Sequence, residues 1–140
     1  MLTRIDHVGI ACVSLDEKIS FYEATLGFAV LSRETNSGQG VREAILQLPD
    51  APPGAAYLQL IEPTAADSPV GRFIARRGEG MHHVGYGVTD IEQALAAVSV
   101  DGVRVIDERP RHGSMGASIA FLHPSSFGGV LTELVQPGPQ

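Results

Sequence analysis

Apolar positions in the first half of the chain predict one strand, one helix and three further strands. Residues 5–13 form an apolar run with several β-branched side chains, which is typical of a central strand. Ser14 and Glu17 then have capping-box spacing, apolar residues follow at helical spacing, and Gly27 provides a helix stop. Turn-forming residues separate the remaining apolar segments, so we expect strands at 28–34, 41–48 and 56–61.

The second half predicts the same order of elements. Asp90 is a candidate N-cap for a helix that runs to about Val100, and Gly102 is its stop. Residues 63–79 connect the halves, and their few apolar residues indicate a short helix with a weak apolar face. The expected strands are 82–88, 103–107, 117–122 and 130–135.

Short segments of the two halves also match residue by residue. Residues 5–9 (IDHVG) are echoed by 82–85 (HHVG), and residues 59–63 (QLIEP) are echoed by 133–137 (ELVQP). His83 lies 76 residues after His7, and Glu133 lies 74 after Gln59, so two single-residue deletions in loops would account for the drift. This agreement indicates a duplicated half-domain.

The length of the chain limits how the two halves can fold. A chain of 140 residues suits one compact core rather than two independent ones. We therefore expect a single α+β domain over residues 1–140. It would contain two βαβββ modules, at about 4–62 and 80–136, joined by the linker 63–79.

Composition excludes several classes of protein. The formal net charge of −6 argues against general nucleic-acid binding, and the content of 44% hydrophobic residues is that of a globular protein. Cys12 is the only cysteine, which excludes an intrachain disulfide and a cluster of thiolate ligands, so a metal site must rely mainly on nitrogen and oxygen. The first residues run straight into patterned sequence without a signal peptide, so we expect a cytoplasmic protein that does not bind membranes.

The repeat carries four residues that suit a metal ion. His7 and His83 occupy matching positions, as do Gln59 and Glu133. Each alone has a structural alternative, a core histidine or a half-exposed strand residue. Their agreement favours ligands, because curved sheets from the two halves would bring all four side chains together. Nitrogen and oxygen ligands suit cobalt, manganese, zinc or nickel.

Glu43 is the candidate acid or base. It lies in the middle of an expected strand, where a charged residue is disfavoured unless it faces solvent or has a function. Its counterpart in the sequence register is Ser118, so the repeat fails at this position. Proton transfer is one interpretation. The alternative is an exposed glutamate that pairs with Arg42 or another arginine.

The glycine-rich, basic loop 109–116 is a candidate site for a substrate anion. Its backbone amides, together with Ser114 and Arg111, could hold a carboxylate near the metal ion. An ordinary turn between strands is the alternative.

The chain resembles the vicinal oxygen chelate superfamily and, within it, the methylmalonyl-CoA epimerase family. The resemblance runs from about Arg4 to Gln136 and rests on five stretches. It implies paired βαβββ modules that form curved mixed sheets around a metal cleft. It also implies one divalent ion, which we expect to be cobalt, with zinc, manganese or nickel as alternatives. The stretches are residues 5–8, 21–27, 39–43, 81–84 and 129–134.

The resemblance implies a role for each candidate residue. His7, Gln59, His83 and Glu133 would bind the ion. Glu43 would exchange the C2 proton of an acyl-CoA substrate on one face, with Glu133 or an ordered water serving the other face. A homodimer is expected because symmetric dimers are the commonest oligomers.

Three other functions remain open within this superfamily. They are a glyoxalase-type lyase or isomerase that acts on a thiol adduct, a metal-dependent dioxygenase and a drug-binding protein. Gln59 argues against the first, because glyoxalases usually carry glutamate there. Metal-dependent dioxygenases of the superfamily use only two histidines and one carboxylate, whereas this chain has four candidate ligands. The small aromatic content, 6% of residues, argues against a drug-binding cavity.

Overall fold

The structure is a computed structural model that describes residues 1–139. Gln140, the last residue of the expected domain, lies outside the described residues. The contacts divide the chain into two compact units. The central unit comprises Val8–His82. The composite unit combines Met1–His7 with the residues from His83 onward. Strands β1 (Leu2–Ala11) and β5 (Gly80–Val88) contribute to both units, because the unit boundaries fall inside these strands.

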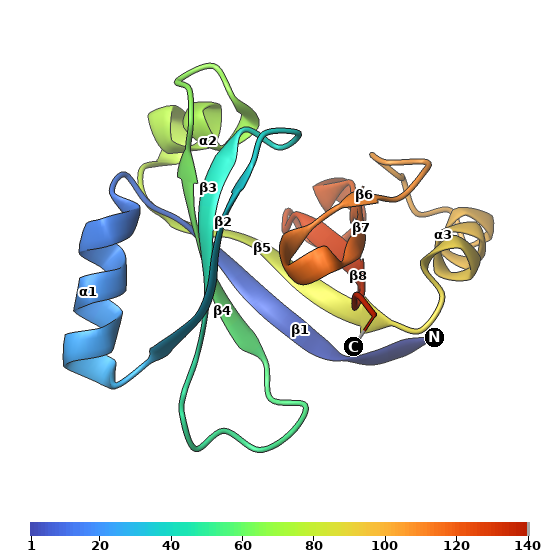
Figure 1. Ribbon diagram of the computed structural model, residues 1–140. Helices are drawn as coiled ribbons and strands as arrows, with labels where there is room; N and C mark the ends of the chain where they lie inside the picture. Colours follow the sequence, from blue (N-terminus) through green and yellow to red (C-terminus); the bar gives the residue numbers. More distant parts are fainter. Residues whose placement is uncertain (140) are drawn as a thin grey trace. The chain divides into compact units, whose positions relative to one another are not determined.

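The central unit consists of a sheet with one helix along its face (Figure 1). Its strands follow the order β2-β3-β4-β1, in which β3 is antiparallel to both β2 and β4. Helix α1 packs on this sheet through a core cluster that includes Ile19, Ala44, Leu46 and Leu60. The remaining elements are α1 (Leu15–Leu26), β2 (Ala29–Asn36), β3 (Val41–Gln47), β4 (Tyr57–Pro63) and α2 (Pro69–Arg77).

The boundaries of α1 confirm the capping signals of the sequence. The Ser14 hydroxyl accepts a hydrogen bond from the Glu17 backbone N–H at 3.2 Å. Gly27 ends the helix in the left-handed region, with φ of 76°. Glycine adopts this conformation without the steric cost that a Cβ atom imposes, so the helix stops there and the chain turns into β2.

The other face of the central sheet carries polar residues as well as apolar ones. Val41 and Ile61 lie on this face and pack against Val70 of α2. Glu43 pairs with Ile61 in the β3–β4 register, and Gln59 lies two residues before Ile61 on β4. Because side chains alternate along a strand, Glu43 and Gln59 share the face that α1 does not cover.

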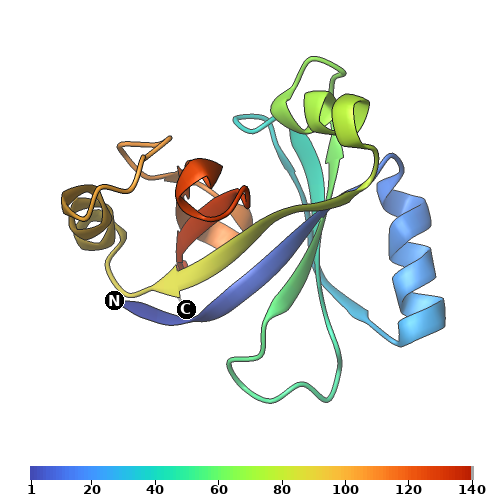
Figure 2. The same cartoon turned by 180° about the vertical axis from the view of Figure 1, so that it is seen from behind.

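The composite unit contains the second copy of the strand-helix order, with the strand sequence β1-β5-β8-β7-β6. Strand β5 is parallel to β8, whereas β7 is antiparallel to β8 and β6, which makes this a mixed sheet. The first part of β1 runs beside β5 (Figure 2). The further elements are α3 (Ile91–Val100), β6 (Arg111–His112), β7 (Ser118–Leu122), β8 (Thr132–Gln136) and the 3-10 turns Ser114–Gly116 and Pro124–Ser126.

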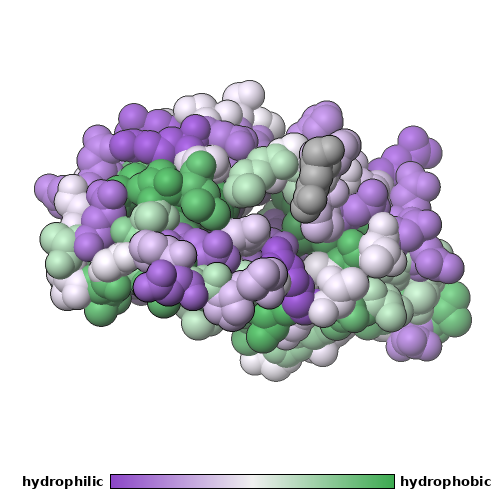
Figure 3. Space-filling view, turned by 60° about the horizontal axis from the view of Figure 1, so that its bottom comes forward, coloured by the Kyte–Doolittle hydropathy of each residue, from purple (hydrophilic) through white to green (hydrophobic). Residues whose placement is uncertain are grey.

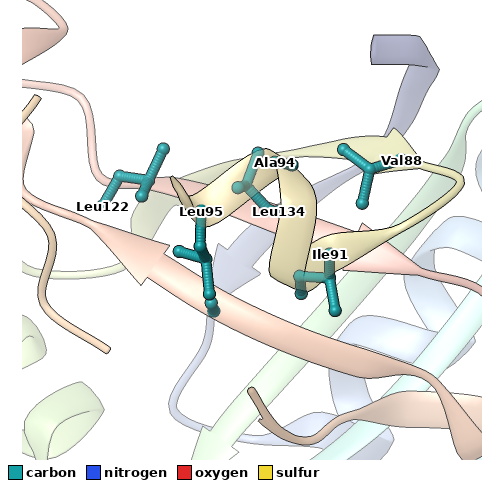
Figure 4. Close-up of a cluster of buried hydrophobic side chains, with 7 residues drawn as sticks. Val88, Ile91, Ala94, Leu95, Leu122 and Leu134 are labelled. Carbon is teal, nitrogen blue, oxygen red and sulfur yellow. The ribbon is translucent and has the colours of Figure 1, made fainter. Parts of the chain in front are cut away.

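Helix α3 closes the core of the composite unit. Ile91, Ala94 and Leu95 point from the helix toward Leu122 and Leu134 on the sheet (Figure 4). All of these side chains are at least 94% buried. Burial of this kind stabilises by about 1.5–3 kcal/mol for each large apolar side chain, so the packing fixes α3 against β7 and β8.

The strand expected at 103–107 is wrong. The segment forms an isolated bridge between Val105 and Leu122 rather than a strand, and the paired edge strand is the two-residue β6. The reason is that the Asp107 side chain accepts a backbone N–H that a neighbouring strand would otherwise bind. A carboxylate oxygen of Asp107 accepts the Phe121 N–H at 2.9 Å, while the backbone N–H groups of Ile106 and Asp107 both donate to the Phe121 carbonyl. These bonds to the single residue Phe121 replace a regular ladder.

A pair of equivalent helix caps supports the repeat. A carboxylate oxygen of Glu62 accepts the N–H of Leu15, the first residue of α1, at 2.7 Å. Gln136 Oε1 accepts the N–H of Ile91, the first residue of α3, at 3.0 Å. Glu62 and Gln136 occupy the same place in the segments 59–63 and 133–137. Both halves therefore bind their helix N-terminus with a side chain from their last strand.

The two antiparallel registers revise one correspondence between the halves. Glu43 pairs with Ile61, two residues beyond Gln59, whereas Ile119 pairs with Val135, two residues beyond Glu133. The structural counterpart of Glu43 is therefore Ile119 rather than Ser118. The repeat still fails at this position, and an apolar residue takes the place of the carboxylate.

The described elements confirm the predicted α+β class. Apolar residues also reach the surface between hydrophilic ones (Figure 3). This is ordinary for globular proteins, whose polar groups do not suffice to cover the whole surface. Within residues 1–139, no helix is long and apolar enough to cross a membrane.

Candidate metal centre and acid/base pair

Three of the predicted ligands lie together in the composite unit. His7 Nε2 lies 2.9 Å from His83 Nε2 and 3.1 Å from Glu133 Oε1. One candidate ligand atom from each residue lies within 4.8 Å of the others. All three residues are at least 94% buried. Neighbouring strands of one sheet provide them, since β1, β5 and β8 are adjacent in the strand order.

A glycine makes room for this arrangement. Gly85 on β5 pairs with Glu133 on the parallel strand β8. A Cβ atom at Gly85 would lie 2.4 Å from Cε1 of His7, which no real contact allows. The His7 ring therefore lies directly over the Gly85 backbone, beside Glu133.

The donor set and its spacing fit a divalent ion. Neutral imidazole nitrogen and carboxylate oxygen are ligands for borderline divalent metals. Two ligand atoms that each lie about 2.1 Å from an ion at an angle of about 90° are about 3.0 Å apart. The distances of 2.9 and 3.1 Å around His7 Nε2 agree with that spacing. The His7, His83 and Glu133 group is thus consistent with a divalent metal site.

The electrostatics of His7 show that this position favours positive charge. Burial by itself lowers the pKa of His7. Hydrogen bonds to Asp6 and Glu133, together with the charges of these two carboxylates, outweigh burial and raise the pKa to about 9. In the metal-free protein a proton on the imidazole thus provides the positive charge that a bound cation would provide.

Asp6 is a functional candidate that the sequence analysis missed. Its Oδ2 lies 2.8 Å from His7 Nδ1, and its Oδ1 accepts a hydrogen bond from Arg4 Nη2 at 2.9 Å. Burial alone would raise the pKa of Asp6, but His7 and Arg4 together lower it. A signal was present, since Asp6 is a charged residue inside an apolar run.

Glu43 and Gln59 form a buried pair in the central unit. Gln59 Nε2 donates a hydrogen bond to Glu43 Oε2 at 2.9 Å. Glu43 is 2% exposed and Gln59 is 7% exposed. The interpretation of Glu43 as an exposed residue that pairs with Arg42 is therefore wrong. The Arg42 guanidinium binds Glu62 instead. The amide donor contributes to the stability of a carboxylate in a place where burial alone would disfavour it.

The amide of Gln59 has two functional ends. Its NH2 group binds Glu43, whereas its carbonyl oxygen is the atom that would bind a metal ion. The ligand role of Gln59 remains a prediction.

Comparisons with known proteins identify the family. The model of the glyoxalase/bleomycin resistance protein/dioxygenase superfamily matches residues 6–121. A Streptomyces coelicolor methylmalonyl-CoA epimerase variant (E43Q) in complex with 2-nitronate-propionyl-CoA is 51% identical. The match covers 99% of this chain and 100% of that chain, with a TM-score of 0.94. The chain belongs to the methylmalonyl-CoA epimerase family of this superfamily.

Two further epimerases support this family membership. Methylmalonyl-CoA epimerase from Mycobacterium tuberculosis is 38% identical, with a TM-score of 0.93, and the match covers 99% of this chain and 90% of that one. The mitochondrial methylmalonyl-CoA epimerase of Bos taurus is 33% identical over 96% of this chain and 75% of its own length. The predicted resemblance is confirmed.

In this member of the epimerase family, the Phe121 ring lies between Arg111 and His83. Its guanidinium carbon lies 5.9 Å from the centre of the Phe121 ring, and that ring packs edge-on against His83 at 5.6 Å. Arg111 pairs with Ile119 in the β6–β7 register and also forms an ion pair with Asp107 at 3.4 Å. Arg111 thus lies one aromatic side chain away from a candidate ligand.

Ser114 begins a strained turn in the same unit. The turn spans Ser114–Gly116, and Met115 has a φ of 56°, which is unusual for a residue with a side chain. Such strain is found where surrounding structure holds a loop in a defined conformation, often at functional sites. The substrate-binding role of Ser114 and Arg111 remains a prediction.

His82, the residue next to His83, packs on helix α2. Its ring packs edge-on against Phe73 of α2, with ring centres 4.9 Å apart. Burial lowers the pKa of His82 to about 4. His82 is therefore neutral near pH 7 and serves the packing of α2 in the central unit.

We expect the metal-free protein to lose stability as pH rises from 6.5 to about 9. The unfolded chain releases the His7 proton near pH 6.5, whereas the folded chain keeps it up to about pH 9. The folded state binds more protons in this window, so its advantage is complete below pH 6.5 and disappears above about 9. Urea unfolding in the presence of a chelator should show a loss of roughly 1–3 kcal/mol.

The control for this experiment is His7→Gln, which removes the titrating group. Its free energy of unfolding should vary less across the same pH range. An equal pH dependence in both proteins would show that His7 does not carry the effect.

Proposed function

We propose that the chain interconverts the (R) and (S) epimers of methylmalonyl-CoA, with Glu43 as an acid/base. The observation that carries this proposal is the buried hydrogen bond from Gln59 to Glu43. A glyoxalase-type glutamate in place of Gln59 would put a second carboxylate against Glu43, and the repulsion would disfavour the charged form of both. A glutamine at this position instead supports a charged base.

The reaction places specific demands on the protein. The proton to be exchanged is on C2, between a thioester carbonyl and a carboxylate, and its removal leaves an enolate. A divalent ion would act as a Lewis acid and stabilise the negative charge that develops on the substrate oxygens. The residues that would hold this ion are His7, His83 and Glu133, with Gln59 as the fourth ligand.

Glu43 would transfer the proton on one face of the substrate. A positioned carboxylate is effective when its lone pair points at the C–H bond, and the hydrogen bond from Gln59 Nε2 restricts the orientation of Glu43. Burial to 2% exposure also keeps bulk water from competing for the carboxylate. Epimerisation needs a donor on the opposite face. Glu133 or an ordered water would fill that role.

A solved relative supports an acyl-CoA substrate. The Streptomyces coelicolor enzyme variant E43Q binds 2-nitronate-propionyl-CoA. A nitronate is a planar, delocalised anion, as is an enolate, and proteins bind mimics of the transition state tightly. For this chain we propose that Arg111 and the turn at Ser114 contact the substrate carboxylate, because Arg111 provides a positive charge near Phe121 and His83.

We base the proposed metal on the donor chemistry and the proposed assembly on what is common among soluble proteins. Cobalt is the ion that we propose, because a site of two nitrogens and two oxygens suits it, and zinc, manganese and nickel are the alternatives. We also propose a homodimer, since symmetric dimers are the commonest assembly of soluble proteins. Light scattering at defined concentrations would measure the mass of the assembly.

Incubation of the cobalt-loaded protein with methylmalonyl-CoA in deuterated water should place deuterium at C2. Mass spectrometry would detect one added mass unit, and chiral analysis would show both epimers. The exchange is expected because the reaction passes through an enolate that takes its proton from the enzyme. Absence of deuterium, with the ion bound, would contradict an epimerase and favour a glyoxalase or dioxygenase activity.

Glu43→Gln should lower turnover by at least about 100-fold while the fold and the metal content stay unchanged. The substitution keeps the size of the side chain but removes its ability to accept the C2 proton. Turnover and metal content would be measured on the same preparation. The matched control is Glu23→Gln on the exposed surface of α1, which should retain full turnover. Retained activity in Glu43→Gln would remove Glu43 from the mechanism.

His83→Ala should abolish stoichiometric metal binding. The substitution removes one of three buried ligand groups that lie within 4.8 Å of one another. Elemental analysis after exhaustive dialysis would give the metal content per chain. His112→Ala, in the exposed strand β6, should retain the metal and serves as the control. Undiminished metal in His83→Ala would contradict the proposed ligand set.

A further inference from the structure

We propose that Asp6, held by Arg4, and Gly85 are positioning residues that present His7 Nε2 to the metal ion. This inference rests on the proposed ion site and adds the part of the chain that orients one of its ligands. All four residues lie in the composite unit.

The first support is a chain of two charge-assisted hydrogen bonds, of which the one to His7 is buried. Asp6 Oδ2 lies 2.8 Å from His7 Nδ1, while Asp6 Oδ1 accepts from Arg4 Nη2 at 2.9 Å. Asp6 is 7% exposed and His7 is 6% exposed. Both carboxylate oxygens of Asp6 therefore have a partner, and the Arg4 guanidinium prevents the carboxylate from turning away from His7.

The second support is the nitrogen that this contact selects. When Nδ1 donates to a carboxylate, Nε2 is the ring nitrogen left for a metal ion. In the structure it is Nε2 that faces His83 at 2.9 Å and Glu133 at 3.1 Å. Partners of this kind fix the orientation of the ring and raise the basicity of the ligand atom.

The third support is the missing side chain at Gly85. A Cβ atom there would lie 2.4 Å from His7 Cε1, 2.7 Å from Nδ1 and 3.0 Å from Nε2. Of these atoms, Nδ1 contacts Asp6 and Nε2 would bind the ion. Any larger residue at this position would push the ring away from both partners, while the backbone of β5 could stay in place.

The contacts described for His7 and for His83 differ in kind. The residue before His83 is His82, whose ring packs against Phe73. His83 packs edge-on against Phe121. The two histidines thus share a position in the repeat but differ in what holds them. In the sequence, an acidic residue precedes His7, whereas a histidine precedes His83.

The test is the affinity of the metal-free protein for Co²⁺ alone, measured by competition with a chromophoric chelator. Asp6→Ala should weaken binding by about 10–100-fold, the range found for such partners of metal-binding histidines. Asp6→Asn should recover part of this loss, because its amide oxygen can still accept from Nδ1. Gly85→Ala should weaken binding at least about tenfold through displacement of the ring.

A structural control separates positioning from general destabilisation. Asp90 caps α3 through a hydrogen bond from the Gln93 N–H at 3.1 Å, in the same unit but without a role in the ion site. Asp90→Ala should lower the melting temperature and leave the Co²⁺ affinity unchanged. Circular dichroism of each metal-free variant would verify that it is folded.

Each outcome decides the proposal. Weaker binding in Asp6→Ala and Gly85→Ala, with partial recovery in Asp6→Asn, supports it. Unchanged affinity in Asp6→Ala, or an equal loss in Asp90→Ala, would overturn it. Absence of Co²⁺ binding by the unmodified protein would overturn the ion site itself. Deuterium exchange at C2 tests the proposed epimerase activity independently of these affinities.

Discussion

Burial of negative charge is the constraint on which the site residues depend. Asp6, Glu43 and Glu133 are each at most 7% exposed, and a carboxylate removed from water needs donors or positive charge to stay ionised. The chain provides a partner for each of them, and His7 serves two of the three. Arg4 and His7 compensate Asp6, the Gln59 amide donates to Glu43, and His7 lies next to Glu133. The contacts that Arg4, His7 and Gln59 make with these carboxylates meet that requirement.

The repeat predicted those parts of the site that both halves share. His7, His83 and Glu133 could be found from sequence because a ligand type recurs in matching segments, and the structure brings their ligand atoms together. Helix caps and glycine stops were equally predictable, since local backbone chemistry determines them. Features that occur once were harder to find. Asp6 lies within an apolar strand segment, and the signal it offers is its charge next to a candidate ligand.

Other errors came from interactions between segments that are distant in sequence. The expected strand at 103–107 has a suitable composition, but the Asp107 side chain takes the Phe121 N–H that a ladder would need. The counterpart of Glu43 was assigned by counting residues, and the ladder register moves it from Ser118 to Ile119. A count cannot show where a deletion falls within a loop. Strand pairing does show it.

The paired helix caps have a consequence for protein engineering. Gln136 lies three residues after Glu133 on β8 and accepts the first N–H of α3, while Glu62 lies three residues after Gln59 on β4 and accepts the first N–H of α1. The last strand of each half therefore carries, within four residues, both a candidate ligand and the side chain that binds the first N–H of a helix. A strand transplanted between relatives would bring both, so the ligand and the start of the helix form one exchangeable module and should be recombined as a unit.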